Sequence, residues 1–312
     1  MGRAELVAAR TAALLPAVPY AALRQLEPPR VAAHFVQRRF EAFGQGAHEH
    51  VARLGTADEA VEFLYADLPW DSQFFAQPSV RLHAALFGPG VTAPVLAEAA
   101  RQFTAQLGAV GTRHAYAEVP AEDTALLYAL GRAGWSVVET RLQYVHEHLD
   151  QLREPRYAVR AAAPDEAELI RAVSARNRNL FDRFHADPAY SPEQADAFLG
   201  EYAAAAVRGY CDTVLVPAAE VVDSFLAISY LAADAAALDT ALGRVVLTAV
   251  GPANRGWHRR LVSETLYHTR ERGGRAVLMT TQATNRAVVH NAEQLGFRLG
   301  GVTLVLSAQP AS

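Results

Sequence analysis

Two long stretches of the chain carry the same order of apolar and polar positions. Each stretch reads as a strand, a loop, a helix, a glycine–aromatic turn and a second strand. A constant shift of 162 residues superimposes GTRHAYAEVPAEDTALLYALGRAGWSVVETRLQYV on GGRAVLMTTQATNRAVVHNAEQLGFRLGGVTLVL. The paired positions include Gly111 and Gly273, Asp123 and Asn285, and Gly134 and Gly296. A register kept over this length indicates an internal duplication.

The second half alternates short β-branched runs with amphipathic or alanine-rich segments. An antiparallel meander that leads into strand–helix–strand is typical of the α+β class. The expected strands lie at 158–160, 213–216, 225–230, 244–250, 276–281 and 302–306, and the expected helices at 165–179, 195–207, 261–272 and 286–294. Together with the duplication, this pattern predicts two tandem units of one architecture.

The segment HLDQLREPRYAVRAAAPDE separates the two copies. It is charged and carries two prolines, as linkers between domains commonly do. We therefore expect an N-terminal domain at 1–152 and a C-terminal domain at 156–312. A chain of 312 residues is comfortable for two domains of ordinary size.

Composition narrows the chemistry. All 29 basic residues are arginine, so Schiff-base catalysis and the lysine of a P-loop are excluded. The net charge of -4 gives no reason to expect a nucleic-acid partner. The single Cys211 rules out an internal disulfide and a thiolate zinc site, and no zinc-protease motif occurs, so we expect no metal.

The sequence also argues against membrane and export functions. No apolar run is long enough to span a bilayer. The N-terminal segment RTAALLPAVPYAAL has a short apolar core broken by two prolines, which is unlike a signal peptide. We expect a cytoplasmic protein without a membrane partner, and a homodimer is compatible with the sequence.

The stretch PANRGWHRRL lies between the strongest predicted strand and a predicted helix. A helix start preceded by glycine exposes free N–H groups and the positive end of the helix dipole, which suits a phosphate. Arginines in a first helical turn are electrostatically unfavourable unless an anion lies nearby. The residues alone leave two interpretations open, a phosphate-binding turn or a plain basic helix start.

The order VVLTAV, P-x-x-RG, helix, GG, strand, TTQATN, helix and LGF resembles the Gcn5-related N-acetyltransferase (GNAT) superfamily. The resemblance covers most of 157–312 and implies a three-layer α/β fold, with acetyl-CoA as co-substrate. It implies that the strand lines the acyl group, the arginine–glycine turn holds the pyrophosphate, and the asparagine begins a helix along the pantetheine arm. The cofactor-binding residues so implied are Leu247, Ala249, Val250, Arg255, Gly256, Trp257, His258, Arg259 and Asn285.

LPWDSQFF and NLFDRFHADPAYSPEQADAFLGEY further resemble segments of the dTDP-fucosamine acetyltransferase group. That group acetylates an amine on a nucleotide-linked sugar, and its first half is a partial copy of the fold. The second segment is polar with aromatic anchors, and could bind hydroxyls and stack on a ring or form a solvated loop. Its candidate substrate-binding residues are Asp182, Arg183, Phe184, His185 and Asp187.

Two departures bear on catalysis. The superfamily pattern RGxGxG is here Arg255-Gly256 followed by Trp257 and three basic residues, so bulky side chains stand where glycines are expected. The helix before Gly-Phe commonly carries an acidic tyrosine, and its place is taken by Ala292. The neighbours His290 and Asn291 are therefore the catalytic candidates, with a surface role as the alternative.

The N-terminal copy has no arginine–glycine turn. Its equivalent loop, LFGPGVTAP, brings no cation to a phosphate, so we expect this copy to be structural. The sequence thus predicts a CoA-dependent N-acetyltransferase that acts on the primary amine of a nucleotide-linked amino sugar. The alternatives are a degenerate GNAT-fold binding module without catalysis and an N-acetyltransferase that acts on a non-sugar amine.

Overall fold

The computed structural model describes residues 1–56, 59–219 and 221–311. The chain folds into two compact units, of which unit 1 comprises Met1–Arg141 with Gly301–Ser312 and unit 2 comprises Leu142–Gly300. The division falls inside β5 (Ser136–His146) and β11 (Arg298–Ala308). Most of the last strand, residues 301–308, therefore belongs to unit 1. The sequence placed this strand in a C-terminal domain that ends at Ser312, a residue outside the described ones.

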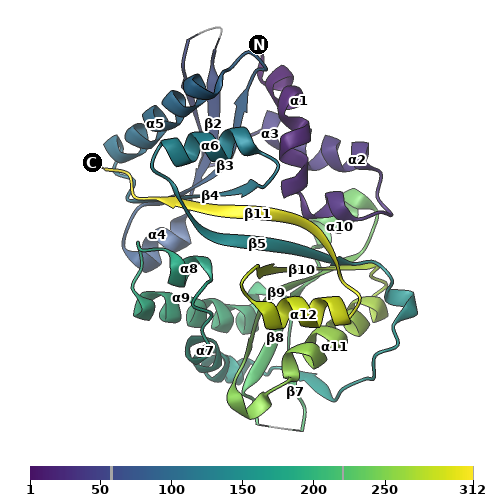
Figure 1. The fold of residues 1–312 in the computed structure, drawn as a ribbon. Helices are drawn as coiled ribbons and strands as arrows, with labels where there is room; N and C mark the ends of the chain where they lie inside the picture. Colours follow the sequence, from purple (N-terminus) through teal and green to yellow (C-terminus); the bar gives the residue numbers. More distant parts are fainter. Residues whose placement is uncertain (57–58, 220, 312) are drawn as a thin grey trace. The chain divides into compact units, whose positions relative to one another are not determined.

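Unit 1 is a sheet with helices on both faces (Figure 1). Its strands follow the order β1-β2-β3-β4-β11. The helices are α1 (Arg3–Leu14), η1 (Leu15–Ala17), η2 (Pro19–Ala22), α2 (Pro28–Ala32), η3 (Ala33–Arg38), α3 (Arg39–Glu41), α4 (Pro69–Phe75), α5 (Ala93–Ala109) and α6 (Thr124–Arg132), and the strands β1 (Glu49–Leu54), β2 (Val61–Asp67), β3 (Ser79–Phe87) and β4 (His114–Pro120).

Alternation along β3 places side chains in two cores. Ala85 and Phe87 pack with α5 and α6, while Ala84 and Leu86 pack with α1 and η3. β11 completes the sheet, because its residues 303–308 pair antiparallel with residues 115–120 of β4. A strand from the second sequence copy thus closes the sheet of the first unit.

Unit 2 repeats this three-layer arrangement, with its strands in the order β10-β9-β8-β7-β6. α11 and α12 cover one face, and α7 and α9 cover the other. The helices are η4 (Leu149–Gln151), η5 (Pro164–Glu166), α7 (Ala167–Arg176), α8 (Arg183–Ala186), α9 (Pro192–Ala205), η6 (Ala206–Tyr210), α10 (Ala232–Leu238), η7 (Pro252–Asn254), α11 (Trp257–Glu271) and α12 (Arg286–Gln294), and the strands β6 (Val159–Ala161), β7 (Thr213–Pro217), β8 (Ser224–Ser229), β9 (Leu242–Val250) and β10 (Ala276–Gln282).

The duplication read from the sequence is confirmed in local geometry. Asp123 caps α6 by accepting from the backbone N–H of Leu126, and Asn285 caps α12 in the same way. Gly134 and Gly296 both follow their helix with φ near +85°, at 88° and 82°, a conformation that glycine adopts without strain. The α+β class and the two tandem units are therefore as predicted.

In unit 2 the two central parallel strands pair only over their first residues. β9 and β10 are joined from Leu242–Ala276 to Arg244–Leu278, and no further pair forms between these described strands. A β-bulge follows at once, because Ala227 of β8 faces Leu247 and Ile228 faces Val245, which leaves one extra residue in β9. The bulge bends β9, and the two strands separate towards their carboxyl ends.

Unit 1 has the same separation. β3 pairs with β4 from Ser79–His114 to Leu82–Ala117, and the register of β3 against β2 shifts at Leu64 and Tyr65, leaving His83 as the extra residue. The two bulges occupy equivalent positions in the duplication. The sheets of both units therefore open at the same point.

Buried histidines make the fold sensitive to acid. Burial lowers the pKa of His146 to about 4, from 6.5, and its ring packs edge-on against Phe297. Because the folded-state pKa lies below the unfolded one, this stabilisation is complete above pH 6.5 and is lost as the pH falls towards 4.

We therefore expect His146→Gln to remove part of the pH dependence of stability. Between pH 7 and pH 4 the free energy of unfolding should fall by about 3 kcal/mol less in the variant than in the parent. Urea titrations at a series of pH values measure this difference. Parallel stability curves for the two proteins would contradict it.

Candidate functional site

The turn after β9 leads directly into the longest helix of unit 2. Gly256 has φ of +90° and precedes Trp257, the first residue of α11. No side chain of the described residues caps this helix start. The positive end of the helix dipole lies at this start, which favours an anion there. The expected helix at 261–272 begins four residues earlier, because the left-handed glycine lets the first basic residues enter the helix.

The turn itself is braced from β8. The Asp223 carboxylate accepts from the backbone N–H of Ala253 at 2.9 Å, and the Asn254 side chain accepts from the Asp223 N–H and the Ser224 hydroxyl, each at 2.9 Å. A side chain at Gly251 would meet the Asp223 carboxylate at 2.2 Å. Sequence reasoning missed Asp223, because its partner lies thirty residues further along the chain.

The three arginines of this region have different surroundings. Arg255 is exposed and forms no ion pair with any described residue. Arg259 donates through Nη2 to both oxygens of Glu154, at 2.9 and 3.0 Å. The Arg260 guanidinium lies over the Trp257 ring, 5.0 Å from its centroid. Only Arg255 keeps its charge directed to the surface without a partner within the described chain.

The bulky residues after Gly256 turn away from the helix start. Trp257 is buried in the apolar cluster beneath α11 and α12. His258 Nδ1 lies 3.0 Å from the side-chain nitrogen of Asn291 on α12. Since an amide nitrogen only donates, Nδ1 is the acceptor and Nε2 carries the ring proton. The structure thus joins one predicted cofactor residue to one predicted catalytic residue.

His258 is held in the neutral form. Burial lowers the pKa of His258 to about 4, and its buried Nε2 has no hydrogen-bond partner among the described residues. A neutral imidazole with a fixed Nε2–H is a hydrogen-bond donor and a poor proton donor at neutral pH.

The other α12 candidates are placed differently. His290 is exposed and forms no hydrogen bond with the described residues. Ala292 is fully buried in the same apolar cluster as Trp257 and Met279. A tyrosine at this position would enter a packed core and strain it.

The part of β9 that lies beyond its last pair with β10 packs against the apolar clusters on both faces of the sheet. Leu247 and Ala249 pack with the α7 and α9 cluster, and Val250 packs with the α11 and α12 cluster. Their backbone lies beyond the last pair with β10, so these peptide groups are not used in that ladder. Peptide N–H groups of this kind can stabilise an oxyanion.

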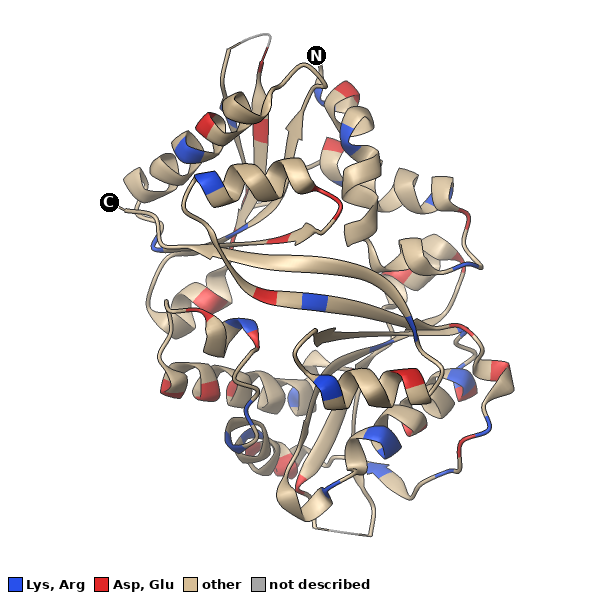
Figure 2. Cartoon of the chain, in the orientation of Figure 1, with Lys and Arg blue, Asp and Glu red and all other residues tan. Residues whose placement is uncertain are grey.

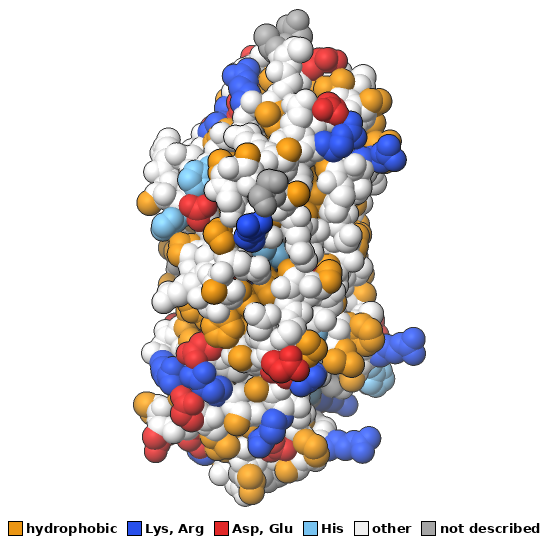
Figure 3. All heavy atoms as spheres, turned by 90° about the vertical axis from the view of Figure 1, so that its left-hand side faces the viewer, with side chains coloured by type: hydrophobic (Ala, Val, Ile, Leu, Met, Phe, Trp, Pro, Cys, Tyr) orange, Lys and Arg blue, Asp and Glu red, His pale blue; other side chains and the backbone are white. Residues whose placement is uncertain are grey.

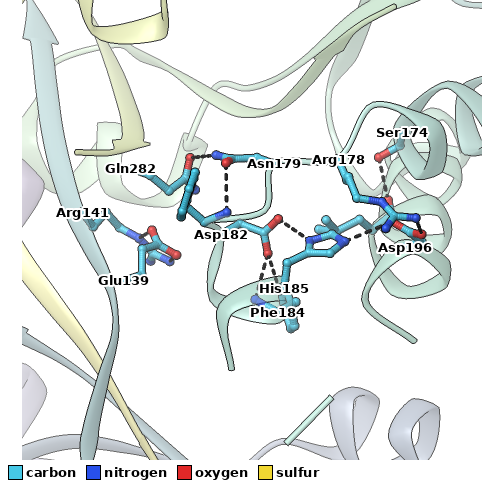
Figure 4. Close-up of polar contacts among 12 residues, drawn as sticks. Glu139, Arg141, Ser174, Arg178, Asn179, Asp182, Phe184, His185, Asp196 and Gln282 are labelled. Carbon is cyan, nitrogen blue, oxygen red and sulfur yellow. Dashed lines mark hydrogen bonds and ion pairs between the residues drawn. The ribbon is translucent and has the colours of Figure 1, made fainter. Parts of the chain in front are cut away.

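The predicted substrate loop is organised around a buried histidine (Figure 4). His185 Nδ1 lies 2.7 Å from Asp182, and Nε2 lies 3.0 Å from Asp196 of α9, which also pairs with Arg178. Asp182 further caps α8 by accepting from the N–H groups of Phe184 and His185. Asp182 and His185 therefore hold the loop together with their own polar atoms.

The remaining loop residues complete this picture. Phe184 is buried against Phe198, the Arg183 guanidinium lies over the Phe184 ring, and Asp187 accepts from the N–H of Ala189. In contrast, Phe181 is 57 % exposed.

The loop is fixed to the sheet at the end of β10. The Asn179 amide donates to the side-chain oxygen of Gln282 at 2.8 Å. Gln282 is the last residue of β10, at the end where β9 and β10 have separated. The exposed Phe181 is therefore held beside the separated ends of β9 and β10. In the sequence, the polar run TTQATN at the end of this strand indicated a functional position. It did not indicate that Gln282 would bond to Asn179.

Charges of both signs are interspersed over the chain (Figure 2). Figure 3 shows acidic and basic side chains adjoining on the face that carries α7 and α9, where Arg171 and Arg208 pair with Glu201. Within the described residues, no cluster of His, Cys, Asp or Glu could hold a metal ion. The described helices include none long and apolar enough to cross a membrane.

Comparison with known proteins identifies the fold. No protein-family model matches the sequence, and no curated protein matches it. The structure is similar to a GCN5-related N-acetyltransferase from Sphaerobacter thermophilus, with a TM-score of 0.55 and 14% identity over 100% of this chain and 95% of that one. It is also similar to a functionally unknown conserved protein from Staphylococcus epidermidis, with a TM-score of 0.54 and 13% identity over 83% of this chain and 94% of that one.

The chain therefore has the fold of the GCN5-related N-acetyltransferases, as the sequence resemblance predicted. The likeness to the Sphaerobacter protein extends over both units. At these identities the likeness concerns the architecture.

The left-handed glycine before α11 provides a first test. We expect Gly256→Ala to lower the free energy of unfolding by about 1 kcal/mol, because alanine is strained at a φ of this sign although the space around the position is open. Gly131→Ala is the matched control. Gly131 is also uncrowded but lies inside α6, where alanine should stabilise by up to about 1 kcal/mol. Equal effects in urea unfolding would show that the turn tolerates a side chain.

Proposed function

We propose that the protein is a CoA-dependent N-acyltransferase that transfers an acetyl group from acetyl-CoA to a primary amine. The observation that carries the proposal is the separation of β9 and β10 at a bulge, directly before the uncapped start of α11. One end of this opening offers peptide groups to an acyl carbonyl, and the other offers helix N–H groups to a pyrophosphate.

The chemistry needs few protein groups. The neutral amine attacks the thioester carbonyl, the C–N bond forms, the C–S bond breaks and CoA leaves as the thiolate. The amine proton passes to solvent. The N–H groups of β9 from Leu247 to Val250 stabilise the oxyanion in this proposal, and α12 lies along the pantetheine arm from Asn285.

Within this site we assign the pyrophosphate to Arg255, Gly256 and the first N–H groups of α11. Arg259 is engaged by Glu154, so its charge is already balanced. Asn291 acts as a positioning residue that fixes the proton on His258 Nε2. His290, exposed and next to Asn291, is assigned to acid–base exchange with solvent.

The acceptor is proposed to be an amino sugar carried on a nucleotide. The loop at Phe181 supports this, because an exposed aromatic ring anchored beside the opening can stack on a sugar or base. The amide side chains of Asn179 and Gln282 supply hydrogen-bonding groups at the same place. An N-acetyltransferase for a non-sugar amine is the rival within the same chemistry.

Acetyl-CoA binding tests the phosphate assignment. Arg255→Gln should weaken binding about tenfold, as expected for loss of one charge-assisted contact to phosphate. Arg259→Gln, an identical change four residues on, should alter the affinity less than twofold. Isothermal titration with the intact protein measures both. Absence of binding to the parent at millimolar acetyl-CoA would instead favour a degenerate binding module without catalysis.

An amine panel with a thiol-release readout tests the acceptor. We expect turnover with a nucleotide-linked amino sugar and little with simple amines or polyamines. Phe181→Ala should raise KM for the sugar nucleotide about fivefold through loss of stacking, whereas Leu180→Ala, at the equally exposed neighbouring position, should not. Activity confined to simple amines would rule against the sugar nucleotide while leaving the acyl transfer intact.

A further inference from the structure

The histidine of the substrate loop (residues 179–187) contacts one carboxylate through each of its two ring nitrogens (Figure 4). His185 Nδ1 lies 2.7 Å from Oδ2 of Asp182, and Nε2 lies 3.0 Å from Oδ1 of Asp196 on α9. The His185 side chain is only 2% exposed, so solvent has little access to the ring. An ionised carboxylate only accepts, so both contacts are hydrogen bonds only if each ring nitrogen carries a proton. We call Asp182, His185 and Asp196 the histidine bridge.

Both carboxylates of the histidine bridge are engaged as anions. Oδ1 of Asp182 accepts from the backbone N–H groups of Phe184 and His185, at 2.8 and 3.1 Å. Oδ2 of Asp196 pairs with the Arg178 guanidinium. Donors on these second oxygens favour the ionised form of each carboxyl group. The arrangement is therefore the one expected of an imidazolium, which donates from both nitrogens.

The charges of the histidine bridge balance only while the ring is protonated. Arg178 and the protonated ring together offset the two carboxylates. On a neutral ring, one nitrogen would direct its lone pair at a carboxylate, and the loop would keep an unbalanced, largely buried negative charge. Among the described residues no other charged side chain contacts the ring; those of the loop and of α9 are Arg183, Asp187, Glu193 and Glu201.

The ring links α9 to the turn that carries Phe181. Asp182 follows Phe181 directly, and its N–H donates to the Asn179 carbonyl at 3.2 Å. The Asn179 side chain accepts from the Phe181 N–H at 3.1 Å and donates to Gln282 of β10 at 2.8 Å. Hydrogen bonds thus connect α9, through His185 and Asp182, with the end of β10. Histidine is the side chain of this series that ordinarily changes charge near neutral pH.

We propose that His185 is a positioning residue for the acceptor: as a cation between Asp182 and Asp196 it holds the substrate loop, and with it Phe181, beside the end of β10. Loss of the ring proton releases the loop. The held loop binds this proton more tightly than the released loop, so by linkage the held form is favoured at low pH and lost as the pH rises. That the loop receives an acceptor rests on the proposed function, whereas the histidine bridge does not.

Amide hydrogen exchange in the intact protein tests the histidine bridge without a substrate. The probes are the N–H groups of Phe181, Asp182 and Ala186, which bond within the loop. Ring ¹⁵N shifts of His185 are recorded over the same alkaline titration. We expect both ring nitrogens to be protonated at about pH 6. Loop protection, corrected for intrinsic exchange, should fall at least about tenfold as the ring loses its proton, because charged hydrogen bonds are lost.

Two outcomes of this titration would overturn the proposal. One is a ring that carries a single proton at the start, and the other is loop protection that stays constant while the ring titrates. The N–H of Val289 in α12, which bonds to the Asn285 carbonyl, is the reference that should keep its protection throughout.

His185→Gln removes the ring charge. Its loop should show the low protection of the alkaline form at every pH. His268→Gln is the matched control, because His268 of α11 is a half-buried histidine of the same unit that lies outside the histidine bridge. Loop protection in this control should follow the parent protein. Equal effects of the two variants would contradict the role of His185.

Asp196→Asn separates the protonation of the ring from a general loss of packing. An amide can turn its oxygen to a charged ring or its nitrogen to a neutral one, so it bonds to both forms. The loop of this variant should stay protected, and its protection should change less than about twofold over the titration. A pH dependence as large as that of the parent protein would contradict the proposal.

Acceptor kinetics test the positioning role. His185→Gln should raise KM for the nucleotide-linked amino sugar about fivefold and leave kcat and acetyl-CoA affinity within about twofold. An unchanged KM would refute the positioning role. Absence of turnover in the parent protein would refute the proposed function and the acceptor's place beside the loop, and the exchange data alone would then decide on the histidine bridge.

Discussion

The parting of two parallel strands at a bulge is the constraint on which both units depend. Pairing of β9 with β10 stops at Arg244 and Leu278, and the extra residue in β9 turns the rest of the strand away. Peptide groups released from a ladder must find other partners, because an unpaired buried N–H or C=O is costly. The groups that contact the separated strands therefore determine whether a ligand can bind between them.

The polar contacts at the separated strands differ between the two units. In unit 1 a side chain of the same unit supplies the partner, since Arg10 reaches Ala85 on β3 and Asp123 at the helix cap. In unit 2 the loop contact at the strand end joins two side chains, because the Asn179 amide donates to the side-chain oxygen of Gln282. A buried arginine fixed at both ends is a permanent part of the fold, whereas a loop with an exposed ring can adapt to a ligand. The strand separation of unit 1 is thus bridged by a buried arginine, and that of unit 2 is flanked by a loop with an exposed aromatic ring.

Much of the fold could be predicted because its signals are local. Helix caps, left-handed glycines and β-branched runs lie within a few residues of the elements they define, so α12 was predicted to the residue at 286–294. The pairing of β11 with β4 could not be predicted in this way. Both copies carry nearly the same apolar pattern in their last strand, and periodicity alone does not say which sheet a strand joins.

At the candidate site, too, contacts between residues far apart in the chain could not be predicted from the sequence. The turn at Arg255 and Gly256 was found from the sequence, but the difference between Arg255 and Arg259 depends on Glu154, which lies about a hundred residues away. Trp257 reads as an obstacle in the sequence and is a core residue in the structure. Asp182 and His185 read as ligand-binding groups, yet they bond to each other and to Asp196. Partner identity, not residue type, sets the role in each case.

The bracing of the turn by Asp223 bears on how an anion would be held there. Its carboxylate already occupies the N–H of Ala253, and its charge disfavours a phosphate at that point. An anion is therefore directed onward, to the N–H groups that open α11 and to Arg255. The same contact fixes the backbone of the turn before any ligand arrives, so little conformational entropy is left to lose on binding. In the proposed site Asp223 thus fixes the turn, and the attraction for phosphate comes from Arg255 and the start of α11.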